Sequence, residues 1–293
     1  MNELNSLVNI GDLAKPATTL IEKVADFTGA CFLPRQIIRV AKAQAKAGKI
    51  KAFADLEISE IQKRGLARLI NEEGRSQANI ENIVAGSLRE LKEDAKPEEI
   101  DDDWLTNFFD KCKKFSAAEM QSLWSKILAG EANKADSFSK RTIEIVSTFD
   151  KNDAQLFTNL CCFGWNIDEF RPLIYGATEQ NENIYKQKDM IFGNLHHLET
   201  IGLIRFEGIA NYGATELPKI MQTSYYDTQI NLEFQAPENN QMILGEVLLT
   251  NAGKQLAPIC GSEKVEGFLD FILNEWQKIG YITSSAFPKS GIA

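Results

Sequence analysis

Helix start and stop signals recur four times between residues 103 and 165, more densely than elsewhere in the chain. A capping side chain accepts a hydrogen bond from a backbone N–H group that the first helical turn leaves free. Residues able to do this are Asp103, Ser116, Ser139 and Asp150. Ser116 and Glu119 also form the S-x-x-E pattern of a capping box, and Gly130 supplies a stop. The pattern predicts four consecutive helices.

Apolar residues within these segments recur at intervals of three and four, which places them on one helical face. The second segment shows this spacing at Met120, Leu123, Trp124, Ile127 and Leu128. Aromatic side chains bury large apolar areas, and burial stabilises by about 25 cal/mol per Å². We therefore expect these helices to form a structural core.

Three motifs stand in this region: W-x-x-I-L-A-G-E at 124–131, F-S-x-R-T at 138–142 and D-A-x-x-F at 153–157. Together they resemble an uncharacterised bacterial family of the domain-of-unknown-function type. The resemblance extends upstream to LIEKVADFTG and downstream to LTNAGKQL. It implies no reaction, ligand or functional residue. Families of this kind suggest a scaffold or sensor in a bacterial stress or phage-defence system.

Composition indicates a folded protein that does not coat nucleic acid. Hydrophobic residues make up 44% and charged residues 25% of the 293 positions, which are values of a globular chain. The net charge of −9 argues against general nucleic-acid coating. The length allows two domains.

The cysteines and the N-terminus favour a cytoplasmic protein. No C-x-x-C pair occurs among the five cysteines, which we interpret as reduced core residues: Cys31, Cys112, Cys161, Cys162 and Cys260. The start of the chain has no basic and apolar signal sequence. The early apolar run, residues 18–34, contains Glu22, Lys23 and Asp26, so we expect no transmembrane helix.

The fold class we expect is mainly α, with an α+β region at the end. Residues 1–91 have the spacing of long amphipathic helices, residues 92–165 that of a helical bundle, and residues 166–293 are richer in Gly, Asn and Tyr. We expect a loop at 92–102 and an amphipathic helix at 262–279.

The last region resembles a winged-helix domain. A predicted helix at 188–201 ends in LETIGLI and leads into a strand at 203–206, and LLTNAGKQL is similar to the segment that follows the wing. Further strands are expected near 171–175 and at 246–250. Residues 208–245 are too long for an ordinary wing, so they hold either further strands or an ordered interaction loop.

Charge is distributed unevenly in the first half. Arg35, Arg39, Lys42 and Lys46 have helical spacing and form a basic stripe, whereas residues 93–110 hold eight acidic residues and one lysine. The stripe has three interpretations: a solvated face or an internal partner for residues 93–110, a contact with an anionic protein or neighbouring subunit, or a nucleic-acid or phospholipid contact.

Residues with catalytic chemistry are few, and we expect no catalytic, metal or cofactor site. His196 and His197 are adjacent, so on a helix their side chains diverge by about 100°. Cys161 and Cys162 fit core packing better than a redox pair. The run Asp101–Asp103 fits a helix cap better than a cation site. Arg141 is a candidate for a buried ion pair with Glu131 or Glu144.

The winged-helix resemblance raises nucleic-acid binding, but charge disfavours it. Residues 151–293 contain 10 Lys and Arg against 17 Asp and Glu. Lys186 and Lys188 are the only basic residues near the start of the candidate recognition helix, which falls short of a phosphate-neutralising set. We therefore favour a non-enzymatic protein-interaction or homo-oligomerisation module. The alternative is a nucleic-acid-binding regulator that uses the basic stripe and the winged helix.

Overall fold

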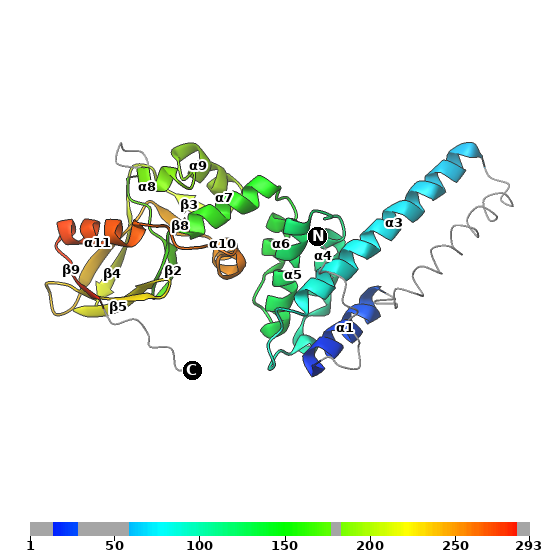
Figure 1. Cartoon of the computed structure of the whole chain (residues 1–293), viewed down its shortest axis with the longest axis horizontal. Helices are drawn as coiled ribbons and strands as arrows, with labels where there is room; N and C mark the ends of the chain where they lie inside the picture. Colours follow the sequence, from blue (N-terminus) through cyan, green and yellow to red (C-terminus); the bar gives the residue numbers. More distant parts are fainter. Residues whose placement is uncertain (1–13, 29–58, 177–182, 286–293) are drawn as a thin grey trace. The chain divides into compact units, whose positions relative to one another are not determined.

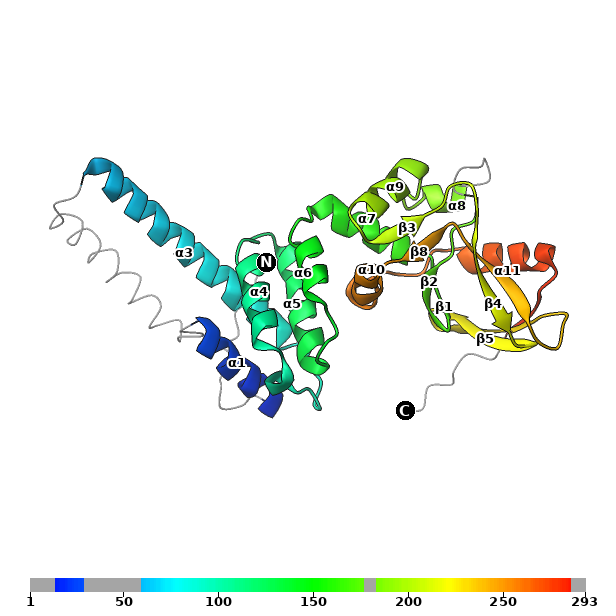
Figure 2. The same ribbon diagram turned by 180° about the vertical axis from the view of Figure 1, so that it is seen from behind.

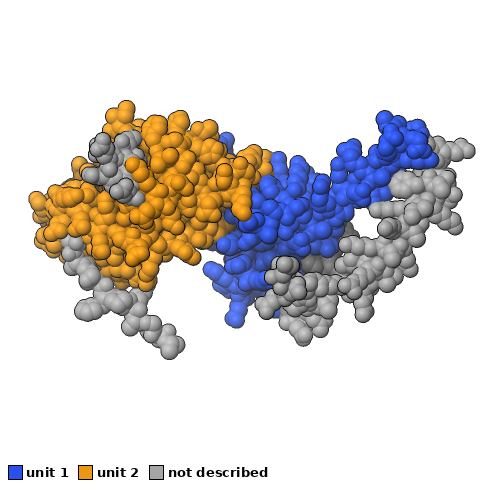
Figure 3. All heavy atoms as spheres, turned by 45° about the horizontal axis from the view of Figure 1, so that its top comes forward, with its two compact units in different colours: residues 1–143 blue, residues 144–293 orange. Residues whose placement is uncertain are grey.

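The computed structural model describes residues 14–28, 59–176 and 183–285. It forms two compact units, residues 1–143 and 144–293 (Figure 3). The described chain is mainly helical, and its antiparallel strands all lie in the second unit, as expected. The finer division at residues 91 and 165 stays a prediction. No helix within the described ranges is both long and apolar enough to span a membrane.

The first unit is built from helices (Figure 1). In chain order its elements are α1 (Lys15–Thr28), α3 (Glu60–Ser87), the short 3-10 helix η2 (Pro97–Glu99), α4 (Asp102–Cys112), α5 (Ala118–Asn133) and α6 (Lys140–Val146), which continues into the second unit. The four helices expected between residues 103 and 165 are thus found as α4, α5, α6 and, in the second unit, α7 (Lys151–Cys161).

Two of the four expected helix starts are confirmed. The Asp150 carboxylate accepts from the backbone N–H of Asp153 at 3.0 Å, and the Asp153 carboxylate accepts from that of Asp150 at 2.9 Å, so both halves of a capping box are present. The Ser139 hydroxyl accepts from the backbone N–H of Thr142 at 3.2 Å. Both residues therefore satisfy donors in the first helical turn.

The other two starts were placed wrongly. Asp101, not Asp103, caps α4, because its Oδ1 accepts from the backbone N–H of Trp104 at 2.8 Å. Ala117 precedes α5 without a side-chain cap. The Ser116 hydroxyl accepts instead from Asn79 Nδ2 of α3 at 3.1 Å, so a tertiary contact replaces the expected capping box.

Gly130 does not end α5, which continues to Asn133. Its role is close packing: a Cβ atom at Gly130 would lie 2.6 Å from the Phe138 ring. A second glycine brings α5 against α3. Ser125 Oγ donates to the Ile83 carbonyl at 2.8 Å, and a Cβ at Gly86 would lie 2.3 Å from that same oxygen. A side chain at either glycine would overlap with the neighbouring side chain, so the packing there would have to shift.

The second unit combines helices with three antiparallel sheets (Figure 2). After α7 its elements are β1 (Gly164–Ile167), β2 (Glu169–Pro172), α8 (Asn183–Lys186), α9 (Phe192–Thr200), β3 (Ile204–Phe206), β4 (Tyr212–Leu217), β5 (Ile220–Tyr225), β6 (Thr228–Glu233), β7 (Asn240–Gly245), β8 (Val247–Leu249), α10 (Asn251–Leu256), η3 (Ala257–Ile259), α11 (Phe268–Ile279) and β9 (Ile282–Ser285). The sheets are β2-β1-β5-β6-β9, β3-β8 and β4-β7.

The long excursion at 208–245 holds strands β4 to β7, so the first of its two interpretations is confirmed. The strands expected near 171–175, at 203–206 and at 246–250 correspond to β2, β3 and β8. The helix expected at 262–279 begins only at Phe268, because Gly267 adopts a left-handed conformation at φ 75°. Strand β1 was not expected.

An aromatic cluster fills the core of the second unit. Trp165 and Trp276 are fully buried, with ring centroids 4.8 Å apart. Trp165 also stacks on Tyr225 at 5.3 Å. The Tyr225 hydroxyl donates to the Cys162 carbonyl at 2.8 Å and accepts from the Val265 N–H at 2.7 Å. The cluster thereby joins β1, β5 and α11 around one apolar centre.

Candidate interaction surfaces

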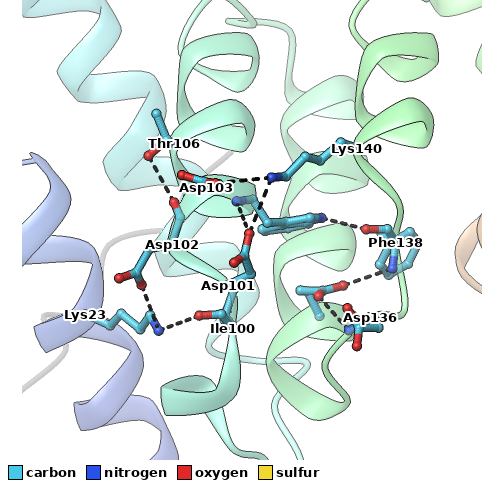
Figure 4. Close-up of polar contacts among 11 residues, drawn as sticks. Lys23, Ile100, Asp101, Asp102, Asp103, Thr106, Asp136, Phe138 and Lys140 are labelled. Atoms are coloured by element: carbon cyan, nitrogen blue, oxygen red, sulfur yellow. Dashed lines mark hydrogen bonds and ion pairs between the residues drawn. The ribbon is translucent and has the colours of Figure 1, made fainter.

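The acidic residues at the start of α4 contact lysines from two other helices (Figure 4). Lys23 of α1 lies 3.2 Å from Asp102 Oδ1, and its ammonium donates to the carbonyls of Glu98 at 3.2 Å and Ile100 at 2.5 Å. The Lys23 side chain is only 17% exposed, so this contact holds α1 against the segment that leads into α4.

Lys140 of α6 approaches the same run from the other side. Its Nζ lies 3.5 Å from Asp101 Oδ1 and 3.8 Å from Asp103 Oδ2. These carboxylates are mostly exposed, and exposed ion pairs stabilise by about 1 kcal/mol or less. Asp101, Asp102 and Asp103 thus each lie within 4.0 Å of a lysine nitrogen from another helix. Across the described residues, no group of three His, Cys, Asp or Glu side chains is placed to hold a metal ion.

Three carboxylates at this end of the unit have no such partner. Glu93, Asp94 and Glu98 are exposed, and no Lys or Arg nitrogen of the described chain lies within 4.0 Å of them. Nearby Glu99 and Asp110 pair with lysines at 2.8 and 3.0 Å. We call Glu93, Asp94 and Glu98 the acidic end, because they follow the C-terminus of α3.

Glu131 of the W-x-x-I-L-A-G-E motif has a structural role. It is 2% exposed, and its two carboxylate oxygens accept from the backbone N–H groups of Asp136 at 2.8 Å and Phe138 at 2.9 Å. The Phe138 carbonyl accepts from Trp104 Nε1 at 2.6 Å. Burial raises the pKa of Glu131, against the lowering effect of these two hydrogen bonds.

Arg141 does not form the expected buried ion pair with Glu131. Its side chain is exposed, and backbone N–H groups satisfy the Glu131 carboxylate instead. The conformation of the turn explains this choice: Asp136 has φ 64°, which directs successive N–H groups toward one acceptor. The first two motifs therefore meet in one turn that joins α5 to α6.

Among the described residues of the first unit, the two most exposed large apolar side chains belong to the outer half of α3. None of its residues from Glu60 to Ala78 is buried, and Ile61 and Leu69 are 71% and 52% exposed. Leu69 stands two heptads before Ile83, which is fully buried against α5, so both lie on one helical face. Figures 1 and 2 both show this half of α3 extending beyond α4, α5 and α6.

Arginines occupy an adjoining face of the same outer half. Arg64, Arg68, Asn71 and Arg75 are spaced four, three and four residues apart, which places them on one stripe. An open hollow of about 480 Å³ is lined, within the described part of the chain, by Arg68, Asn71, Glu72 and Arg75. We call Arg64, Arg68 and Arg75 the arginine face. Sequence reasoning missed it, although its spacing equals that of the expected basic stripe.

Two of the six candidate contact residues chosen from sequence lie within the described residues. Arg35, Arg39, Lys42 and Lys46 lie outside the described residues. Lys186 is exposed at the end of α8, and Lys188 is half-buried in the turn after it.

The two histidines of α9 contact different carboxylates, as their divergent side chains require. His196 Nδ1 lies 3.2 Å from Glu199 Oε2, and His197 Nε2 lies 2.7 Å from Asp153 Oδ1 of α7. The second contact joins α9 to the start of α7.

The described cysteines form no disulfide, and three of the four are core residues, as expected. Cys112, Cys161 and Cys162 are buried, and Cys260 is half-buried. Burial raises the pKa of Cys112 and of Cys161, which keeps these thiols protonated and unreactive. Cys31 lies outside the described residues.

One protein family matches residues 63–273, from the outer half of α3 into α11. The match covers well over half of the chain. The chain belongs to the DUF2806 family of proteins of unknown function. The expectation of a domain-of-unknown-function family is thereby confirmed. Neither the curated proteins nor the solved structures contain a significant match. The matched DUF2806 region includes the arginine face, the acidic end and the Glu131 turn.

Proposed function

We propose that this DUF2806 protein is a non-enzymatic interaction module that self-associates through the outer half of α3. The observation that carries the proposal is the exposed apolar face of Ile61 and Leu69, which continues the face that α5 covers farther along α3. A second copy would cover the outer half as α5 covers the inner half.

Helix energetics support this proposal. Residues 60–78 form about five turns of α3, and most of the stability of a helix in a protein comes from the packing of its apolar face. The Ser59–Gln62 capping box and the exposed ion pair between Arg68 and Glu72 stabilise only this local segment. Association would bury Ile61 and Leu69 and add packing of this kind.

The double substitution Ile61→Glu and Leu69→Glu tests the proposal. We expect it to reduce self-association at least about tenfold, because two charges would enter an apolar contact. Light scattering measures the average mass of the particles in solution. Protein concentrations on the order of tens of micromolar suit the test, because many dissociation constants lie in this range. Both side chains are exposed within one chain, so the double variant should still fold, which circular dichroism can check.

A matched control is available in the second unit. Ile209 and Ile220 are also exposed, and Ile209→Glu with Ile220→Glu adds the same charge to other surfaces. This control should associate like the parent protein. An equal loss in both double variants would show a general effect of charge and would contradict the assignment to α3.

A winged-helix arrangement is our proposal for residues 151–256. The order α7, β2, α8, α9, β3, β8 supports it, with β3 and β8 antiparallel in the place of the wing strands. Thr250 Oγ1 accepts from the Gly253 N–H at 3.2 Å and donates to the Gly202 carbonyl at 2.7 Å. A Cβ at Gly253 would lie 2.2 Å from the Leu203 oxygen, which accounts for the T-x-x-G spacing.

Protein contact fits this arrangement better than duplex binding. The sequence of α9 contains no Lys or Arg, whereas a duplex reader neutralises several phosphates. Its exposed residues include Phe192 and both histidines. The alternative, a nucleic-acid-binding regulator, requires salt-dependent duplex binding that is lost when Lys186 and Lys188 are replaced by Glu. A cytoplasmic location and a role in bacterial stress or phage defence stay predictions.

A further inference from the structure

Opposite charges lie toward opposite ends of α3. Residues 60–78, the outer half of α3, contain four Lys and Arg and three Asp and Glu, a net charge of +1 in a chain whose total is −9. Within this range the described helix presents the arginine face at Arg64, Arg68 and Arg75. The acidic end begins at Glu93, six residues after α3 terminates at Ser87.

These two surfaces cannot neutralise each other along one straight helix. At about 1.5 Å per residue, Arg75 lies roughly 18 Å and Arg68 roughly 28 Å from the last residue of α3. Exposed charges are largely screened beyond about 8–10 Å at physiological ionic strength. The acidic end of the same chain therefore does not neutralise the arginine face.

Neither surface is satisfied by its neighbours in the described chain. Arg68 has an exposed ion pair with Glu72 at 3.3 Å, and Arg64 and Arg75 have none. At the other end, Lys23, Lys96, Lys113 and Lys140 pair with other acids and leave Glu93, Asp94 and Glu98 available.

We infer that the arginine face of α3 docks on the acidic end of a second copy of this chain. The inference rests on the proposed self-association and adds its orientation. A two-fold axis makes the contact twice, because each copy supplies one arginine face and one acidic end. Guanidinium groups suit such a contact, since they bind carboxylates through two parallel hydrogen bonds. The charge pattern thereby selects an antiparallel arrangement of the two α3 helices.

A charge-swap experiment tests this arrangement. The first variant carries Arg68→Glu and Arg75→Glu, and the second carries Glu93→Lys and Asp94→Lys. Each variant alone would place like charges together at both symmetric contacts, so its self-association should weaken more than about tenfold. In a mixture, the arginine face of the second variant meets the acidic end of the first, as in the parent. At the other contact, the glutamates of the first variant meet the lysines of the second, so the two charges are exchanged but still opposite. A mixed dimer should therefore form with an affinity near that of the parent.

The measurement uses the full chain, with one variant carrying a fluorescent label. Labelled first variant should associate with unlabelled second variant and not with unlabelled first variant, and added salt should weaken the mixed dimer. Circular dichroism confirms that both variants are folded, and restoration in the mixture itself excludes misfolding.

Three results would overturn the inference. If both variants self-associate like the parent while Ile61→Glu with Leu69→Glu does not, the proposed function holds and the docking arrangement is wrong. If the parent protein is monomeric, both are wrong. If the parent instead binds duplex DNA or RNA, and only that binding is lost in the first variant, the arginine face recognises phosphates.

Discussion

Trp124→Ala is expected to destabilise the first unit by about 3–5 kcal/mol, the usual loss for a large buried aromatic residue. Trp124 is fully buried, and its ring packs edge-on against Phe108 at 5.3 Å and tilted against Phe115 at 5.5 Å. Truncation would leave a cavity among these rings that surrounding helices cannot fill. Denaturant unfolding followed by circular dichroism measures the loss.

Trp124→Phe is the informative companion variant. The indole N–H of Trp124 has no hydrogen-bond partner among the described residues, so phenylalanine would remove a buried donor while it keeps most of the ring contacts. We expect a clearly smaller loss than for alanine. An unfolding midpoint that does not change in Trp124→Ala would contradict the central position of this side chain.

Glu131→Ala is expected to cost about 2–4 kcal/mol, because two backbone N–H groups lose their acceptor and each such loss costs about 1–3 kcal/mol when buried. The groups are those of Asp136 and Phe138. Glu131→Gln keeps one acceptor oxygen and should cost less. Glu73→Ala, at an exposed position of α3, is the control and should change stability by no more than about 0.5 kcal/mol.

The loss should also depend on pH. Burial raises the pKa of Glu131 in the folded protein above its ordinary value of about 4.3. Its contribution to stability is then fully present below the unfolded pKa and falls as pH rises through the folded pKa. The cost of Glu131→Ala should therefore be larger at about pH 4 than at about pH 7. The opposite trend would contradict the assignment of a raised pKa.

Local sequence signals predicted the helices well and their starts less well. Spacing of apolar residues depends only on helix geometry, so α4 to α7 could be expected without knowledge of their neighbours. Ser116 shows the limit: its S-x-x-E pattern is sound, but Asn79, 37 residues earlier, uses the hydroxyl instead. Strand β1 follows α7 after a short turn, and its four residues were too few for a period to be recognised.

The surfaces were harder to predict than the fold. The basic stripe was sought as a run without acidic residues, and Glu72 and Glu73 hide the arginine face from such a search. The helical period is the better signal, because it places the three arginines on one side of the helix although two glutamates lie between them in the sequence. The contact between Lys23 and Asp102 joins residues 79 positions apart, and the Glu131 turn depends on a left-handed residue, Asp136. No local pattern contains either feature.

Sedimentation equilibrium of the unmodified protein tests the central claim most directly. We predict that the average mass rises with concentration from that of one chain, 32.8 kDa, toward twice that value, and that the rise is lost in Ile61→Glu with Leu69→Glu. A mass that stays at 32.8 kDa throughout the micromolar range would contradict self-association through α3.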